Sequence, residues 1–294
     1  MLTETFIRDH KLPKAFATIA NDFYIPLANK IFSHQKSASI PYFVGINGCQ
    51  GSGKSTLSEF LQVYLQSEHN LSVVVMSLDD FYFSQADRET LATDIHPLFK
   101  TRGVPGTHDT YLIKQALQKL QQQTQSVTIP RFNKATDNPF PTEEWTVIDR
   151  QVDVVIFEGW CWGVNGQDES ELTMPVNELE AIQDKQLVWR RYVNSILKRD
   201  YQPLYEYMNL WVMFEAPSFA DVYAWRLEQE QKLVEKLAGK VTSGVMSPAE
   251  IKDFIQYYQR LTEHSFKTLP NTCDHLFTLD SSRAIISYQR KGQQ

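Results

Sequence analysis

A glycine-rich segment follows an apolar run early in the chain and reads Gly48-Cys49-Gln50-Gly51-Ser52-Gly53-Lys54-Ser55-Thr56. It fits the pattern G-x-x-x-x-G-K-[ST], in which glycines let backbone N–H groups turn inward around a chain of phosphates. The start of a following helix adds partial positive charge. Lys54 can reach the β- and γ-phosphates, and the Ser55 hydroxyl can bind Mg²⁺. We therefore expect residues 48–56 to form a phosphate-binding loop (P-loop) for a nucleoside triphosphate.

Apolar runs alternate with amphipathic stretches on both sides of this loop. Pro41 opens the run 42–46, which predicts a buried strand, and the apolar positions of 56–66 share one helical face. Further strands are expected at 71–78, 127–129, 152–157, 210–214 and 275–279. Helices are expected at 110–122, at 219–237 and after the cap Ser247-Pro248-Ala249-Glu250. The alternation predicts an α/β chain with the three-layer P-loop nucleoside triphosphate hydrolase fold, in which helices cover both faces of a mostly parallel central sheet.

Irregular stretches follow three of the expected strands, near 78–109, 130–143 and 159–185. Ligands of such sheets bind beyond the carboxyl ends of the strands, so we expect the three insertions to meet at one cleft. No repeat and no long linker divides the chain. We therefore expect a single domain over 1–294, with an N-terminal helical extension at 1–39 and the core at 40–294.

Composition restricts the classes of partner. The chain has 294 residues, of which 42% are hydrophobic and 22% charged, as in ordinary globular proteins. Its formal net charge is −6 and its pI is about 5.7, so we expect neither nucleic acid nor an anionic membrane as a partner. An anionic ligand then needs a local basic site. The oligomeric state stays open.

The cysteines indicate a reducing compartment. Cys49, Cys161 and Cys273 lie far apart and in no metal-ligand spacing. The first residues contain no apolar leader, and no apolar run approaches the roughly 20 residues that cross a bilayer. These features predict a cytoplasmic protein. Cys49 lies inside the P-loop, where a redox role is an alternative to a simple filler position.

Two carboxylate positions follow expected strands. Asp79-Asp80-Phe81-Tyr82 comes directly after 71–78, and Glu158 ends the run 152–157. A kinase needs a carboxylate that orients or deprotonates the acceptor hydroxyl, and Asp79 is our candidate, with Asp80 in reserve. Glu158 is a candidate for the Mg²⁺ side of the site. The alternatives are a helix cap or a Mg²⁺-bound water at Asp79, and a cap or an ion pair at Glu158.

Cationic side chains cluster in the insertions. Arg102 and His108 belong to Arg102-Gly103-Val104-Pro105-Gly106-Thr107-His108-Asp109, and they suit a carboxylate or a hydroxylated substrate. Asp109 is placed to cap the helix that begins at Thr110. Arg131 and Lys134 follow the next strand and add positive charge.

Arg226, on the expected helix 219–237, is a candidate for an arginine that reaches the γ-phosphate, and an exposed ion pair is the alternative. Arg190 and Arg191 are weaker candidates. Asn133-Lys134-Ala135-Thr136-Asp137 is one residue too long for the guanine motif Asn-Lys-x-Asp, so we interpret it as a coincidence.

Together these segments resemble the P-loop small-molecule kinases that include uridine kinase, phosphoribulokinase and pantothenate kinase, and most closely the plant- and fungal-type D-glycerate 3-kinases. The resemblance runs from about residue 40 to Met246-Ser247, and Arg102–Asp109 is its most specific part. The other matching stretches are 48–56, 78–82, 130–134, 157–160, 216–217 and 225–230.

The resemblance implies ATP, Mg²⁺ and phosphoryl transfer to a hydroxyl of a small hydroxy acid, with D-glycerate as the first candidate. It implies that Asp79 and Lys54 are catalytic and that Asp80, Tyr82 and the insertion residues bind the acceptor. Two positions depart from the plant-type pattern: Val104 stands in place of Asn, and Asn133 in place of Asp. A uridine or other nucleoside kinase is therefore an alternative, and an ATP-binding regulator is a third.

Overall fold

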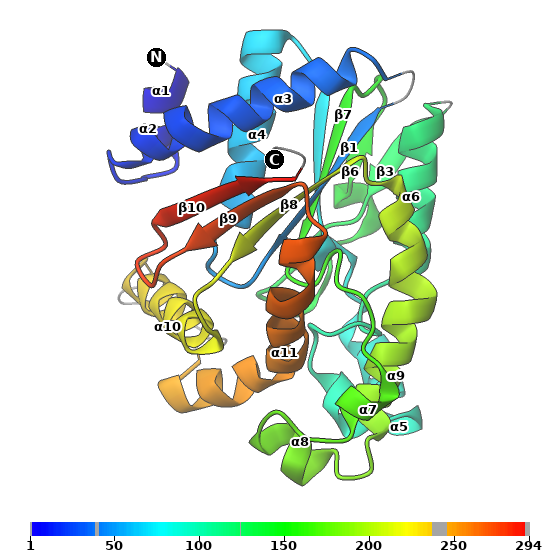
Figure 1. Ribbon diagram of the computed structural model, residues 1–294. Helices are drawn as coiled ribbons and strands as arrows, with labels where there is room; N and C mark the ends of the chain where they lie inside the picture. Colours follow the sequence, from blue (N-terminus) through cyan, green and yellow to red (C-terminus); the bar gives the residue numbers. More distant parts are fainter. Residues whose placement is uncertain (1, 39–40, 124, 237–245, 292–294) are drawn as a thin grey trace.

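The computed structural model describes residues 2–38, 41–123, 125–236 and 246–291 (Figure 1). A six-stranded sheet in the order β10-β9-β8-β1-β7-β2 lies at its centre. Its strands are β1 (Tyr42–Gly48), β2 (Val73–Ser77), β7 (Val154–Gly159), β8 (Leu210–Glu215), β9 (His275–Leu279) and β10 (Ile285–Arg290). All pairs are parallel except β9 with β10. The mostly parallel sheet expected from the sequence is confirmed.

Helices from the N-terminal part of the chain cover one face of the sheet. They are α1 (Leu2–Asp9), α2 (Phe16–Ile19), the π-helix η1 (Ala20–Tyr24), α3 (Ile25–Gln35) and α4 (Lys54–His69). Aromatic rings join them to the sheet, since Tyr24 contacts Phe214 and Phe277 at centroid distances of 6.4 and 6.3 Å. The N-terminal helices thus share one buried cluster with the strands.

The opposite side carries α6 (Thr110–Gln122) and α9 (Val188–Ile196), which continues through η5 (Leu197–Tyr201) and η6 (Gln202–Tyr207) (Figure 1). Below the sheet lie α10 (Phe219–Lys236) and α11 (Pro248–Thr268), which ends at η7 (Leu269–Asn271). Ser247 and Glu250 form the expected capping box of α11. Among the described residues, none of the helices is both long and apolar enough to cross a bilayer.

Short elements fill the insertions. They are η2 (Leu78–Phe81), α5 (Gln85–Asp94), η3 (Pro97–Lys100), β3 (Val127–Ile129), β4 (Phe132–Asn133), β5 (Asn138–Pro139), η4 (Thr142–Glu144), β6 (Thr146–Ile148), α7 (Glu169–Leu172) and α8 (Glu178–Gln183). β3 pairs with β6, and β4 pairs with β5. The sequence did not predict α5, because its only buried side chain is an arginine, Arg88.

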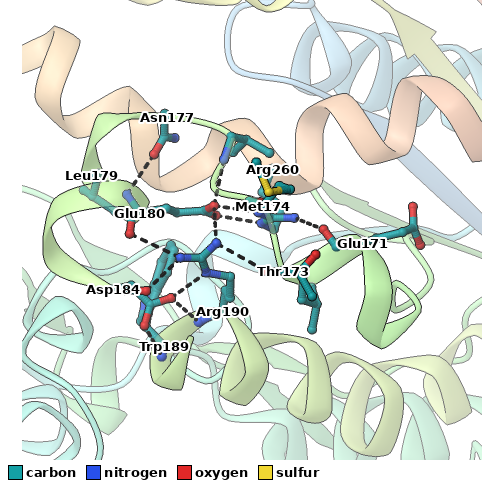
Figure 2. Close-up of polar contacts among 12 residues, drawn as sticks. Glu171, Thr173, Met174, Asn177, Leu179, Glu180, Asp184, Trp189, Arg190 and Arg260 are labelled. Carbon is teal, nitrogen blue, oxygen red and sulfur yellow. Dashed lines mark hydrogen bonds and ion pairs between the residues drawn. The ribbon is translucent and has the colours of Figure 1, made fainter. Parts of the chain in front are cut away.

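A buried ionic network fixes α7, α8 and α9 against α11 (Figure 2). Glu180 accepts from Arg260 at 2.7 and 2.6 Å and lies 3.3 Å from Arg190, which also donates to Asp184 at 2.8 Å. Arg260 donates further to the carbonyls of Glu171 and Met174. Residues 169–190 are therefore held on α11.

Strand register brings the ends of three strands together. Glu158 on β7 pairs with Ile46 on β1 and with Ser77 on β2. The P-loop leaves β1 two residues after Ile46, and Asp79 follows Ser77 by two residues. Three chain segments with polar side chains therefore meet at this carboxyl edge.

Candidate functional site

The P-loop turns into α4 through two glycines with positive φ, Gly51 at +80° and Gly53 at +94°. A Cβ at Gly51 would lie 2.7 Å from Cβ of Trp225 on α10, so only glycine fits there. Two buried polar atoms of this segment, Gln50 Oε1 and Ser52 Oγ, have no hydrogen-bond partner among the described residues. The loop therefore has the backbone shape of an anion cradle, and the unpaired Ser52 hydroxyl can donate to a phosphate.

Lys54, Ser55 and Glu158 meet at the floor of the site. The Ser55 hydroxyl donates to Glu158 Oε1 at 2.9 Å, and Lys54 Nζ lies 3.9 Å from Glu158 Oε2. Burial raises the pKa of Glu158, and the charge of Lys54 offsets part of that increase. Glu158 Oε2 is buried without a hydrogen bond among the described residues. A hydroxyl beside a carboxylate with a free oxygen is a donor set suited to Mg²⁺.

Asp79 lies on η2 and already has two partners. Lys134 Nζ donates to its Oδ2 at 2.5 Å, and the Tyr82 hydroxyl donates to its Oδ1 at 3.1 Å. Burial raises the pKa of Asp79, but the charges of Lys134 and Lys54 outweigh burial and lower the pKa to about 2. The carboxylate is therefore ionised at any physiological pH.

Asp80 pairs with the other predicted cation of this segment. Arg131 donates to Asp80 Oδ2 at 2.9 Å and to the Thr146 hydroxyl at 2.9 Å. The Phe132 N–H donates to Asp80 Oδ1 at 3.3 Å. Burial raises the pKa of Asp80, and the Arg131 charge offsets only part of the effect. Asp80 thus fixes Arg131 and the start of β4 beside the site.

One pocket of about 390 Å³ joins these groups. Its lining includes the expected Gln50, Gly51, Lys54, Ser55, Asp79, Asp80, Arg131, Lys134 and Glu158. It also includes Ser77 and Gln229, which no sequence motif indicated. The P-loop and the Asp79 region therefore face the same space.

Arg102 does not line this pocket and is held by a residue that the sequence did not indicate. Its guanidinium pairs with Asp137, and its carbonyl accepts from the Tyr258 hydroxyl at 3.2 Å. Asp137 also lies 2.7 Å from the buried Arg88, which bonds to the carbonyls of Phe83, Lys100 and Asp137. Arg88 lies on the polar helix α5, so nothing in the sequence indicated that it would be buried and would hold Asp137.

His108 is buried and uncharged, which corrects the idea that it adds positive charge. Its ring stacks on Tyr82 with centroids 4.3 Å apart, and its Nδ1 lies 2.6 Å from the Tyr201 hydroxyl. Burial lowers the pKa of His108 to about 3, although the nearby Asp79 offsets part of this effect. Any contact of His108 with a substrate is therefore that of a neutral ring.

Three further candidates have mainly structural partners. Asp109 caps α6 by accepting from the Leu112 N–H at 2.9 Å, as expected. Arg226 pairs with the buried Glu230 at 2.6 Å and does not line the pocket. Burial raises the pKa of the Cys49 thiol to about 12, which argues against the redox alternative.

No protein-family model matches the chain. A protein of Schizosaccharomyces pombe, the uncharacterized kinase mug58, is 32% identical over 244 residues, which cover 79% of this chain and 83% of the yeast protein. The chain belongs to the P-loop kinases. The chloroplastic D-glycerate 3-kinase of Arabidopsis thaliana is 28% identical to this kinase over 227 residues, which cover 74% of this chain and 46% of the plant protein.

A solved structure shares the fold of this kinase. D-glycerate 3-kinase from Cryptococcus neoformans superposes with a TM-score of 0.76 at 24% identity, covering 91% of this chain and 98% of that one. The expected fold and family are thus confirmed. As a P-loop kinase, the protein is an enzyme that uses ATP to phosphorylate a small molecule.

Proposed function

We propose that this kinase transfers the γ-phosphoryl group of ATP to a hydroxyl of D-glycerate and forms 3-phosphoglycerate. The observation that carries the proposal is the single pocket lined by the P-loop, Asp79 and the two cations Lys134 and Arg131. A small acid needs a group that orients its hydroxyl and cations for its carboxylate. Two similar proteins, one plant and one fungal, are named D-glycerate 3-kinases.

Neither Val104 nor Asn133, the two departures from the plant-type pattern, lines this pocket. Val104 is buried and lines a crevice with Trp189 and Tyr257. The Asn133 side chain accepts from the Ala135 N–H at 3.0 Å, a turn contact that an aspartate makes equally well. Neither departure therefore argues against glycerate as the acceptor.

The floor of the site fits Mg²⁺. Among the described residues, no group of three or more His, Cys, Asp or Glu side chains forms a metal cage. Mg²⁺ does not need one, because it keeps waters and binds through one or two protein oxygens and the substrate phosphates. Ser55 and the free oxygen of Glu158 would hold it, and the ion would neutralise charge on the phosphates.

Asp79 acts mainly by orientation. Since its pKa is about 2, it is a weak base, and it accepts a hydrogen bond from the acceptor hydroxyl rather than removing the proton early. The transition state of phosphoryl transfer is loose, so the rate depends more on positioning of the reactants and on charge stabilisation than on a strong base. Lys134 stays beside Asp79 and uses another of its three N–H donors for the carboxylate of the acid, while Lys54 stabilises charge on the transferred group.

We also propose that the kinase is a single-domain protein that works in the cytoplasm. One buried cluster includes side chains from Phe6 to Leu279. All three cysteines are free and buried, which suits a reducing compartment.

A panel of acceptors tests the function. Purified protein is incubated with ATP·Mg²⁺ and, separately, D-glycerate, uridine or pantothenate, and ADP release is measured with mass analysis of the product. We expect D-glycerate alone to accelerate ADP release strongly and to yield 3-phosphoglycerate. Acceleration by uridine without glycerate would establish the nucleoside-kinase alternative.

The Lys54→Ala variant is the control for the P-loop. We expect it to weaken ATP binding and to abolish ADP release with every acceptor. Lys54 binds the phosphates of ATP, whatever the acceptor is. ADP release that no acceptor accelerates in the unmodified protein would favour the ATP-binding regulator.

A further inference from the structure

One ring nitrogen of His108 is buried without a partner. His108 is 2% exposed, and its Nε2 makes no hydrogen bond to any described residue, although Nδ1 is bonded to Tyr201. Buried polar atoms are paired in nearly all proteins, because an unpaired one loses its hydration without compensation. This atom therefore needs a partner that the folded chain does not provide.

Tyr201 decides which nitrogen carries the proton. Its phenol and His108 Nδ1 lie 2.6 Å apart, so one of the two groups donates to the other. If the O–H donates to His108 Nδ1, only Nε2–H is unpaired. If Nδ1–H donates instead, both the phenol O–H and the Nε2 lone pair are unpaired. The first arrangement leaves fewer unpaired groups, so His108 carries its proton on Nε2.

The His108 side chain lies beside that of Tyr82, which bonds to Asp79. His108 and Tyr82 oppose each other in an antiparallel bridge, so their side chains project to the same side. Their rings stack with centroids 4.3 Å apart, and the Tyr82 hydroxyl donates to Asp79 Oδ1 at 3.1 Å. One stacked ring therefore separates His108 from the Asp79 carboxylate.

Burial keeps His108 neutral. It lowers the pKa of the ring more than the charge of Asp79 raises it, and Tyr82 and Tyr201 pack against the ring. A neutral N–H suits the uncharged oxygen of a hydroxyl, whereas Lys134 and Arg131 suit a carboxylate.

We propose that His108 Nε2–H donates a hydrogen bond to a second hydroxyl of the acceptor, one that is not phosphorylated, and that Tyr201 is the positioning residue that fixes the His108 tautomer. The inference rests on the proposed function. In D-glycerate, the C3 hydroxyl faces Asp79 and the carboxylate faces the cations, which leaves the C2 hydroxyl for His108. His108 is then a specificity residue for acceptors with neighbouring oxygens.

The test compares D-glycerate with 3-hydroxypropanoate, which lacks the C2 hydroxyl. His108→Asn moves the side-chain amide away from the Nε2 position, and we expect kcat/KM for glycerate to fall roughly 100-fold, the scale of a lost buried hydrogen bond. We expect kcat/KM for 3-hydroxypropanoate to change by about twofold at most, since it makes no such bond. His108→Gln, whose amide lies near the Nε2 position, restores most of the glycerate activity.

Tyr201→Phe keeps the ring and removes the tautomer control. We expect a loss of about tenfold in kcat/KM for glycerate and none for 3-hydroxypropanoate. Ring ¹⁵N spectra of histidine-labelled protein, with His108 assigned by its loss in His108→Gln, give a readout independent of activity. They should show Nε2 protonated in the unmodified protein and a mixture in Tyr201→Phe.

Several results would overturn the proposal. Equal losses with both acceptors would make His108 a structural residue, and unchanged glycerate kinetics in His108→Asn would remove the contact. A proton on Nδ1 in the ring spectra would refute the role of Tyr201. Unmodified protein that does not phosphorylate D-glycerate contradicts the proposed function itself, and that result is seen before any variant is made.

Discussion

Two clusters of charged side chains in this kinase differ in their exposure to solvent. At the pocket, Asp79 and Lys134 pair with exposed fractions of 34% and 60%. In the network of Figure 2, Glu180 and Arg190 pair with exposed fractions of 1% and 2%. Pairs open to water are weak and can exchange partners, whereas buried charges depend on their partners. The comparison separates charges that we propose bind the substrate from charges that hold the scaffold.

The largest expected effect is on stability and comes from the buried network. Glu180→Gln removes the acidic partner of the buried Arg260 and leaves Arg190 with Asp184, so we expect the free energy of unfolding to fall by about 3–5 kcal/mol. Urea unfolding measures this free energy.

Glu228→Gln is the matched control, because Glu228 is 41% exposed and pairs with Lys232 and Arg283. We expect a change of about 1 kcal/mol or less there. Equal losses in the two variants would erase the distinction between the clusters.

The next effect is on turnover at the pocket. Asp79→Asn removes the acceptor orientation, and we expect kcat to fall by ~10² or more while ATP affinity and urea stability stay unchanged. Steady-state kinetics with the true acceptor and nucleotide titration measure these quantities. Unchanged kcat would remove Asp79 from its proposed role.

A smaller effect should appear in acceptor affinity. Lys134→Met removes the cation that we assign to the carboxylate, and we expect KM for the acid to rise about tenfold with little change in stability. Lys232→Met is the control, since Lys232 is 61% exposed on α10 and pairs with Glu228. If the two variants have the same KM, Lys134 does not contact the acid.

The smallest effect concerns pH. Burial lowers the pKa of His108 to about 3, and burial together with Arg290 lowers the pKa of His275 to about 4. Between these values and about 6.5 the unfolded chain binds more protons than the folded one, so stability falls as pH falls through that window. His275→Gln, far from the pocket, should flatten the decline in urea midpoint between pH 7 and pH 5. An unchanged slope would contradict the buried neutral state.

Much of the architecture could be predicted because its signals are local. The P-loop pattern, the apolar strand runs and the capping box at Ser247 each depend on a few neighbouring residues. The strand β10 was missed, because its residues are mostly half-buried or exposed and give no apolar run.

The site was predictable only in part. Asp79 and Glu158 were found because each ends an apolar strand. Asp137 and Tyr201 were not, because each acts through a partner distant in sequence: Asp137 through Arg88 and Arg102, and Tyr201 through His108. Such pairings depend on tertiary packing, which a single sequence does not display.

The contact between Gly51 and Trp225 has a consequence for how the sequence can vary. Gly51 is restricted by the loop conformation and also by Trp225, whose Cβ would lie 2.7 Å from a Cβ at position 51. Every residue except glycine carries that atom, so a smaller side chain at 225 does not make room. The Trp225 indole N–H donates to the Ser281 carbonyl at 2.9 Å, which ties α10 to the turn between β9 and β10. Among homologous chains that keep this approach of α10, position 51 should therefore stay glycine, although the P-loop motif leaves it free.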